Sequence, residues 1–233
     1  MSTEKTSEPS ISIIIVHYET PHYALKLLET LGTGTNIEIL LVDNSRTNEL
    51  QDQIIDTFPS IRYLYTGKNL GFSGGINYGL LEARGEWNFV LNSDTKASIQ
   101  DIKKLIMITK SKNYLVAAPK LLAQDSSVQN NVGFLPTFTK DPINWLRNKP
   151  RFLDCKNIFE EKEVSLLSGT AMLFHKSVIE EIGYFDDENY FIDFVDFDFS
   201  RRLMEHKISI LYVPQVQIIH YTDIPFKPEI MST

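Results

Sequence analysis

The sequence is poor in cysteine, which limits how its fold can be stabilised. Its 233 residues include one cysteine, Cys155. A single thiol cannot form a disulfide within the chain, and few cysteines are typical of proteins in reducing compartments. The first ten residues, MSTEKTSEPS, also lack the basic and then apolar pattern of a secretory signal peptide. We therefore expect a cytoplasmic protein that is stabilised by a hydrophobic core.

Two further absences narrow the classes of partner. No apolar run is long enough to cross a bilayer, so any association with the cytoplasmic membrane is expected to be peripheral, at its inner face. The sequence also has no run of lysine and arginine, and its formal charge is −7. Proteins that bind nucleic-acid phosphates need a basic face. The sequence thus predicts no nucleic-acid partner, and it does not indicate an oligomeric state.

The composition that remains is typical of a globular domain. Apolar residues make up 42% of the chain and charged residues 23%. This length is sufficient for one domain with a substantial core. We expect a single domain over residues 11–221, with tails at 1–10 and 222–233.

Strand-like and helix-like segments alternate in the first half of the chain. Apolar runs typical of buried strands occur at 11–18, 37–44, 61–65 and 87–94, and helix-like segments at 21–31 and 73–85. This alternation predicts an α/β fold with a mostly parallel sheet, in which ligands bind beyond the carboxyl ends of the strands. Three of these ends carry the polar clusters HYET, VDNS and NSDT.

The second half is predicted to be less regular. Expected helices lie at 101–110, 177–183 and 199–206, and expected strands at 114–122, 164–176, 208–214 and 216–221. Residues 124–162 read as irregular and contain FLPTF and a candidate helix, INWLRNK.

The VLNSDT motif places Asp94 at the end of a predicted strand. A divalent cation that binds phosphate oxygens needs only one or two such carboxylates from the protein. The alternative is that Asp94 caps the helix that begins near Ser98 or closes a turn. Asp43 in VDNS presents the same choice, between contact with a nucleotide and an Asx-turn. His220, at the end of VQIIHY, is either a metal ligand or a structural histidine.

The glycine-rich segment NLGFSGGINYG supplies a second pattern. Glycines allow backbone amides to approach a phosphate closely, whereas the alternative is a tight turn with close helix packing. The segment is not a phosphate-binding P-loop, because it lacks the lysine followed by serine or threonine. A third pattern, FIDFVDFDFS, mixes aspartates with phenylalanines. Its structural interpretation is a helix N-terminus with the rings in the core.

Taken in order, these motifs resemble the family 2 glycosyltransferases of the glycosyltransferase-A fold, especially bacterial rhamnosyltransferases. The resemblance runs from Ile11 to His220 and is carried by SIIIVHY, LLVDNS, NLGFSGGINYGLLEARGEWNFVLNSDT, APKLL, LLSGTAMLFHKSVIEEIGYFDDENYFIDFVDFDFSRRL and VQIIH. It implies a nucleotide-sugar-binding donor half, residues 11–97, and an acceptor and catalytic half, residues 98–221.

The resemblance also implies roles for individual residues. NSD resembles the family's Asp-x-Asp element with Asn92 in the first position, so that Asp94 and His220 would bind Mn²⁺ or Mg²⁺. The nucleotide sugar, a dTDP-, UDP- or GDP-sugar, would contact His17, Tyr18, Glu19, Asp43, Gly71, Phe72, Gly75, Asn77, Asn92, Ser93 and Asp94.

On the acceptor side, the resemblance implies that Asp196 is the catalytic base. Gly169, Thr170, Asp198 and Arg202 would lie on the same side, and Val195 replaces the family's glutamate. The implied reaction is an inverting transfer of rhamnose or a hexose to a glycan or polyprenyl-linked acceptor, in the synthesis of cell-surface polysaccharide. In such a single displacement the base removes the proton of the acceptor hydroxyl.

Two alternatives from other functional classes stay open on the sequence alone. The first is a noncatalytic glycosyltransferase-like module that binds nucleotide or glycan; Val195 and Asn92 favour it, whereas Asp94, Asp196 and His220 oppose it. The second is a sugar-1-phosphate nucleotidyltransferase, which would require a glycine-rich segment and a basic residue after the first strand. Neither follows the first strand here.

Overall fold

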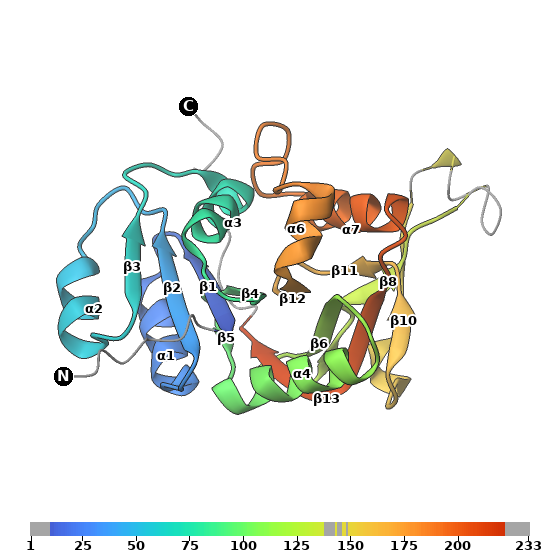
Figure 1. The fold of residues 1–233 in the computed structure, drawn as a ribbon, viewed down its shortest axis with the longest axis horizontal. Coiled ribbons are helices and arrows are strands. Elements are labelled where there is room, and N and C mark those ends of the chain that lie inside the picture. Colours follow the sequence, from blue (N-terminus) through green and yellow to red (C-terminus); the bar gives the residue numbers. More distant parts are fainter. Residues whose placement is uncertain (1–9, 138–142, 144–145, 148, 222–233) are drawn as a thin grey trace, which may run out of the picture.

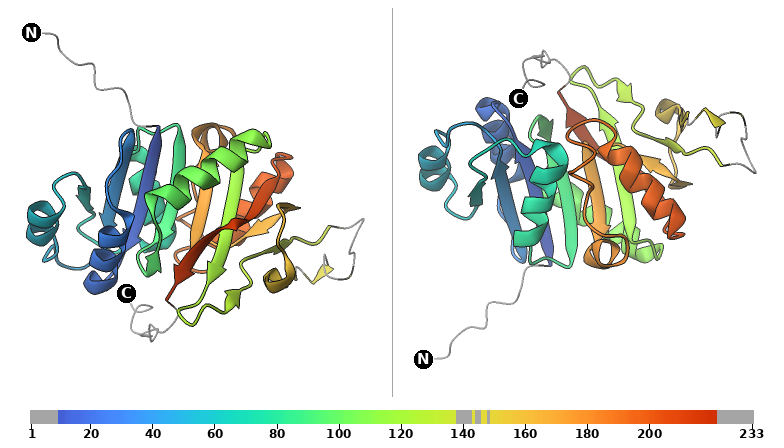
Figure 2. Two further views of the ribbon diagram at one scale, coloured as in Figure 1. Left: turned by 90° about the horizontal axis from the view of Figure 1, so that it is seen from below. Right: turned by 90° about the horizontal axis from the view of Figure 1, so that it is seen from above.

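One ten-stranded sheet runs through both halves of the molecule (Figure 1). The structure is a computed structural model that describes residues 10–137, 143, 146–147 and 149–221. The strand order is β10-β13-β6-β12-β4-β1-β2-β3, with β5 paired to β13 and β7 to β6. Helices cover both faces of the sheet (Figure 2). The predicted α/β class is confirmed, and the assignment of the two halves to donor and acceptor remains a prediction.

The first four long strands are parallel, as predicted. They are β1 (Ile11–His17), β2 (Ile37–Asp43), β3 (Arg62–Tyr65) and β4 (Trp87–Asn92). Side chains alternate between the two faces of a strand. In β1, Ile13 and Ile15 enter the core on one face, and Ile14 and Val16 the core on the other. Two apolar faces explain why β1 reads as an unbroken apolar run.

The sheet of the second half is mixed and departs from the parallel pattern. Strand β12 (Ala171–His175) is antiparallel to both of its neighbours, β4 and β6 (Val116–Leu122). The single strand expected over 164–176 is wrong, because the chain forms β10 (Lys162–Val164), β11 (Leu166–Leu167) and β12. The two strands expected at 208–221 form one, β13 (Ile210–His220), whose register shifts between Val213 and Gln217. Proline within a strand is typical of such irregularities, and Pro214 lies there.

The helices divide between the faces of the sheet. On one face lie α1 (Pro21–Leu31) and α4 (Ile99–Ser111); on the other lie α3 (Gly71–Glu82), α6 (Lys176–Ile182) and α7 (Val195–Glu205) (Figure 1). A further helix, α2 (Gln51–Thr57), was not expected from the sequence, because it has seven residues and buries only Ile54. Helices α3 and α7 begin two and four residues earlier than expected, at Gly71 and Val195.

Short elements occupy much of the region that reads as irregular. They include β5 (Thr95–Lys96), β7 (Val128–Gln129) and the 3-10 helix η1 (Cys155–Asn157). A separate three-stranded sheet has the order β11-β8-β9, in which β8 is Val132–Phe134 and β9 is Arg151–Phe152. The candidate helix INWLRNK and the end of FLPTF fall partly on residues outside the described part, as do both predicted tails. Among the described residues, no helix is long and apolar enough to span a membrane.

Candidate active site

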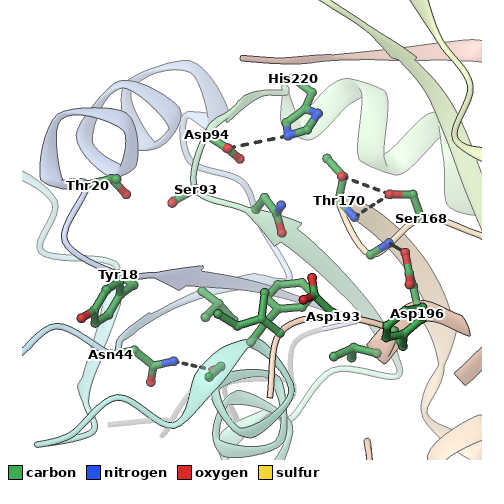
Figure 3. A pocket seen from close by; sticks show the side chains of 18 of the residues that line it. Tyr18, Thr20, Asn44, Ser93, Asp94, Ser168, Thr170, Asp193, Asp196 and His220 are labelled. Atoms are coloured by element: carbon green, nitrogen blue, oxygen red, sulfur yellow. Dashed lines mark hydrogen bonds and ion pairs between the residues drawn. The ribbon is translucent and has the colours of Figure 1, made fainter. Parts of the chain in front are cut away.

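A cavity of about 800 Å³ opens where β1, β2 and β4 end (Figure 3). It is lined by ten of the predicted site residues: Tyr18, Gly71, Phe72, Asn92, Ser93, Asp94, Gly169, Thr170, Asp196 and His220. All three polar clusters of the strand ends contribute to it, HYET through Tyr18 and Thr20 and VDNS through Asn44. The strand ends thus meet residues of the C-terminal half across one cavity.

The pair formed by Asp94 and His220 lies at one edge of this cavity (Figure 3). Nε2 of His220 is 3.6 Å from Oδ2 of Asp94. Both side chains are about four-fifths buried, and Oδ1 of Asp94 is buried without a hydrogen-bond partner among the described residues. The two residues come together although they lie more than half the chain apart in sequence.

The orientation of the His220 ring is set by Gln129. Nε2 of Gln129 donates to the backbone oxygen of His220, which turns Oε1 of Gln129 towards Nδ1 of the ring, 2.9 Å away. Because Oε1 can only accept, Nδ1 is the protonated nitrogen of a neutral ring, and Nε2 of that ring presents a lone pair to Asp94. This is how a second residue commonly orients a metal-ligating histidine.

A lone pair that faces a carboxylate, next to a buried carboxylate oxygen without a partner, is an arrangement that a hard divalent cation would satisfy. The described residues contain no group of three or more His, Cys, Asp or Glu side chains that could hold a metal ion. Asp94 and His220 would therefore share a cation with ligand or water oxygens. The alternative role of Asp94 as a helix cap is not what the structure shows, because Oγ of Ser98 accepts from the backbone N–H of Asp101 and caps α4.

Asp196 lies in the first turn of α7, on the other side of the cavity from Tyr18 (Figure 3). Its Oδ2 accepts from the backbone N–H of Gly169 at 3.1 Å, and its Oδ1 accepts from the N–H of Phe197 at 2.9 Å. Burial raises the pKa of the Asp196 carboxyl, and the two N–H donors oppose that rise. Because the folded-state pKa lies above the unfolded one, Asp196 favours folding below its unfolded pKa, and this contribution is lost as pH rises through the folded value.

Two residues close to Asp196 in sequence, Asp198 and Val195, make contacts that stabilise the fold. Asp198 pairs with Arg202 one turn later, with Oδ2 of Asp198 accepting from Nε of Arg202 at 2.8 Å, and neither side chain lines the cavity. Val195 lines the cavity, yet it is 3% exposed and packs in the core. The structural interpretation of FIDFVDFDFS is therefore right only in part. The segment does enter a helix and Phe199 is buried, but Phe191 and Phe194 are exposed and Asp198 does not cap α7.

The segment before α7 is attached to α3. The side-chain oxygen of Asn77 accepts from the N–H of Phe185, and its amide donates back to the oxygen of the same residue. The backbone oxygen of Phe191 accepts from the N–H of Phe72 at 2.7 Å. Asn77 thus holds the 185–191 segment in place and does not line the cavity.

The glycines of NLGFSGGINYG mainly permit close packing. Gly71 has φ +72°, and a Cβ there would lie 2.3 Å from the backbone oxygen of Phe191. A Cβ on Gly75 would lie 2.7 Å from Val16, and one on Gly79 would lie 2.4 Å from Ile14. Gly71 lines the cavity, whereas Gly75 faces β1 and does not.

Three other predicted donor residues, His17, Glu19 and Asp43, lie behind the cavity wall and connect the loops there. Oδ1 of Asp43 accepts from the N–H of Ser45, an Asx-turn, and its Oδ2 accepts from the hydroxyl of Tyr63. His17 is 1% exposed, and burial lowers the pKa of its imidazole. Glu19 is exposed and accepts from the N–H of Arg46.

Several lining residues were not predicted. They include Val16, Thr20, Asn44, Asn69, Ser168, Ile192 and Tyr221. The alternation of a strand could have identified Val16, which lies one residue before the end of β1, whereas Thr20 lies in the loop after the strand. Asn44 is 1% exposed, and its amide donates to the oxygen of Gly71.

Comparison with known families settles the class of the protein. The family described as "Glycosyl transferase family 2" matches residues 12–183. The chain belongs to glycosyl transferase family 2. It is therefore a glycosyltransferase, which confirms the predicted enzyme class and removes the noncatalytic module and the nucleotidyltransferase as alternatives.

Curated relatives of this glycosyltransferase are similar along most of its length. It is 29% identical over 232 residues to the low-salt glycan biosynthesis hexosyltransferase Agl10 of Haloferax volcanii, covering 93% of this chain and 69% of that protein. It is 24% identical to the N-acetylglucosaminyl-diphospho-decaprenol L-rhamnosyltransferase of Mycobacterium tuberculosis, covering 91% of this chain and 76% of the other. It is 26% identical to the dTDP-rhamnosyl transferase RfbF of Shigella flexneri, covering 91% and 69%. The predicted likeness to rhamnosyltransferases is confirmed.

The fold has a solved counterpart. A crystal structure of GalNAc-T7 with UDP, GalNAc and Mn²⁺ superposes with a TM-score of 0.69 over 92% of this chain and 44% of that chain, at 13% identity. This similarity confirms the glycosyltransferase-A fold.

Proposed function

We propose that this glycosyltransferase moves rhamnose or a hexose from a nucleotide diphosphate donor to a glycan or polyprenyl-linked acceptor by a metal-dependent, inverting displacement. The proposal places this reaction in the synthesis of cell-surface polysaccharide at the inner face of the cytoplasmic membrane. The names of the relatives from Mycobacterium tuberculosis and Shigella flexneri support rhamnose, and that of the Haloferax volcanii relative supports a hexose.

The observation that carries the proposal is the set of residues that line the cavity of about 800 Å³. It combines a metal-binding pair, Asp94 and His220, with a buried carboxylate, Asp196, on a separate wall (Figure 3). An inverting displacement needs these two functions apart, because the base and the leaving group act on opposite sides of the anomeric carbon.

In the proposed mechanism the donor occupies the wall made by Tyr18, Asn44 and the Gly71–Phe72 backbone, with its diphosphate at Asp94. A divalent cation bound there would stabilise the charge of the departing diphosphate. Asp196 accepts the proton of the acceptor hydroxyl as that oxygen attacks. A raised pKa makes the carboxylate a stronger base, and the two backbone N–H donors stabilise its ionised form.

Calorimetric titration with dTDP-rhamnose, UDP-glucose and GDP-mannose, with and without Mn²⁺, tests this proposal. We expect one donor to bind preferentially and to require Mn²⁺. Asp94→Ala should abolish the effect of Mn²⁺, whereas the matched variant Asp125→Ala, in an exposed turn, should behave as wild type. Equal binding in the presence and absence of Mn²⁺ in wild type would refute the metal assignment.

A further inference from the structure

We propose that a second cavity, beside the catalytic one, binds the diphosphate and hydrocarbon chain of a polyprenyl-diphosphate-linked acceptor. This cavity has a volume of about 560 Å³ and lies in the acceptor half, between the three-stranded sheet and the end of α7. The inference rests on the proposed function, because it takes Asp196 as the base that activates an acceptor hydroxyl.

The charge of this cavity is opposite to that of the whole chain. Lys149, Arg151 and Lys207 line it together with a single carboxylate, Glu163, in a chain whose formal charge is −7. Glu163 already accepts from the hydroxyl of Tyr114 at 2.9 Å. Across the described residues, no side-chain hydrogen bond or ion pair engages any of the three cations. A diphosphate would supply the missing anion, and an arginine can bind it with two parallel hydrogen bonds.

Most of the remaining lining is apolar, and the other members are Thr137, Ser165 and Ser209. The apolar residues include Phe134, Leu135, Val164, Met204 and Ile208. Phe134 is 36% exposed, so an aromatic ring faces solvent next to the cations. Such a combination of apolar wall and cationic rim suits an amphiphile with an anionic head, whereas a soluble glycan would need neither feature.

The small sheet connects this cavity to the catalytic one. Arg151 pairs with Phe134, and Phe152 pairs with Gly133. Because adjacent residues of a strand point to opposite faces, Arg151 and Phe134 share the face of the second cavity and Phe152 points the other way. The Phe152 ring packs edge-on against Phe197, with ring centroids 6.2 Å apart.

Phe197 directly follows Asp196 and lines the catalytic cavity. Strand β9 has two residues and is the edge of its sheet. The contact between the Phe152 and Phe197 rings therefore links the strand that carries Arg151 to the helix turn that carries Asp196. We expect the acceptor sugar to lie along these two rings, with its hydroxyl at Asp196 and its diphosphate at Arg151.

The test uses farnesyl diphosphate as a soluble probe of the full chain, measured by calorimetry. We expect it to bind more tightly than inorganic diphosphate or farnesol, because only the probe has both parts. The double variant Arg151→Gln/Lys207→Gln should weaken binding by about tenfold or more, since two charge-assisted contacts are lost. Lys103→Gln, an exposed lysine on α4 across the sheet, is the matched control and should bind as wild type.

Unchanged affinity in the double variant, or an equal loss in Lys103→Gln, would overturn the proposal. A third outcome would also overturn it: the double variant loses binding to phosphatidylglycerol vesicles but still binds farnesyl diphosphate. The second cavity would then be part of a membrane-docking face. The proposed function fails separately: Asp196→Asn should retain farnesyl diphosphate binding, and a wild-type protein that binds the probe but transfers no sugar would refute only the function.

Discussion

The N-terminal and C-terminal halves of the domain present residues to the cavity in different ways. In the N-terminal half, the end of β1 and the loop after it contribute residues 16, 18 and 20, whereas His17 and Glu19 contact the neighbouring loop. In the C-terminal half, six consecutive residues, 192–197, all line the cavity, because the chain passes there from a loop into the first turn of α7. A polar cluster at a strand end is therefore only partly available to a ligand, whereas a loop that enters a helix exposes a whole segment.

The largest expected effect concerns the segment 192–197. Asp196→Asn should lower the transfer rate by about 10² to 10⁴, because the base is lost, while donor affinity stays the same. Transfer is measured with the preferred donor, and affinity by calorimetry. Asp198→Asn is the matched control, since its carboxylate pairs with Arg202 outside the cavity. Full activity in Asp196→Asn would remove this residue as the base.

The next largest effect concerns Gln129, which does not line the cavity but hydrogen-bonds the ring of His220. Gln129→Ala should weaken Mn²⁺-dependent donor binding by about 10- to 100-fold, as loss of an outer contact to a metal-ligating histidine typically does. Binding without Mn²⁺ should be unaffected. If Gln129→Ala weakens both equally, Gln129 supports the fold rather than the orientation of His220.

A third prediction concerns the packing of α3 on the donor half. Gly79→Ala should lower the free energy of unfolding by about 1–3 kcal/mol, because the new methyl group would lie 2.4 Å from Ile14 in the core. Urea denaturation measures the change. Leu81→Ala, on the exposed side of the same helix, is the control and should have a much smaller effect. Equal stabilities of wild type and Gly79→Ala would show that the contact relaxes freely.

The smallest effect is on pH dependence. Asp193 lines the cavity, and its negative charge helps to raise the pKa of Asp196. Transfer requires the ionised base, so activity should fall as pH drops through this raised pKa. Asp193→Asn should move that acid limb of kcat/KM to lower pH, because the ionised form becomes easier to reach. An acid limb that moves to higher pH, or does not move, would contradict the contribution of Asp193.

The sequence predicted most of the fold and the meeting of the strand ends. Buried parallel strands produce unbroken apolar runs such as ISIIIVH, which are easy to recognise. It did not predict the division of VSLLSGTAMLFHK into three strands, since apolar residues in short strands of different sheets look alike. Nor did it show that Asn44 lines the cavity and Asp43 does not, because their orientations depend on hydrogen bonds to Tyr63 and Gly71, which only the folded chain brings near.

The position of His220 has a consequence for how the protein is made. Strand β13 is the last long element of the described chain, yet it lies between β10 and β6 and also pairs with β5, next to Asp94. During synthesis the N-terminal strands leave the ribosome first and can pair among themselves. The contact between Asp94 and His220 cannot form until nearly all of the described domain has emerged, so a shorter nascent chain lacks this pair.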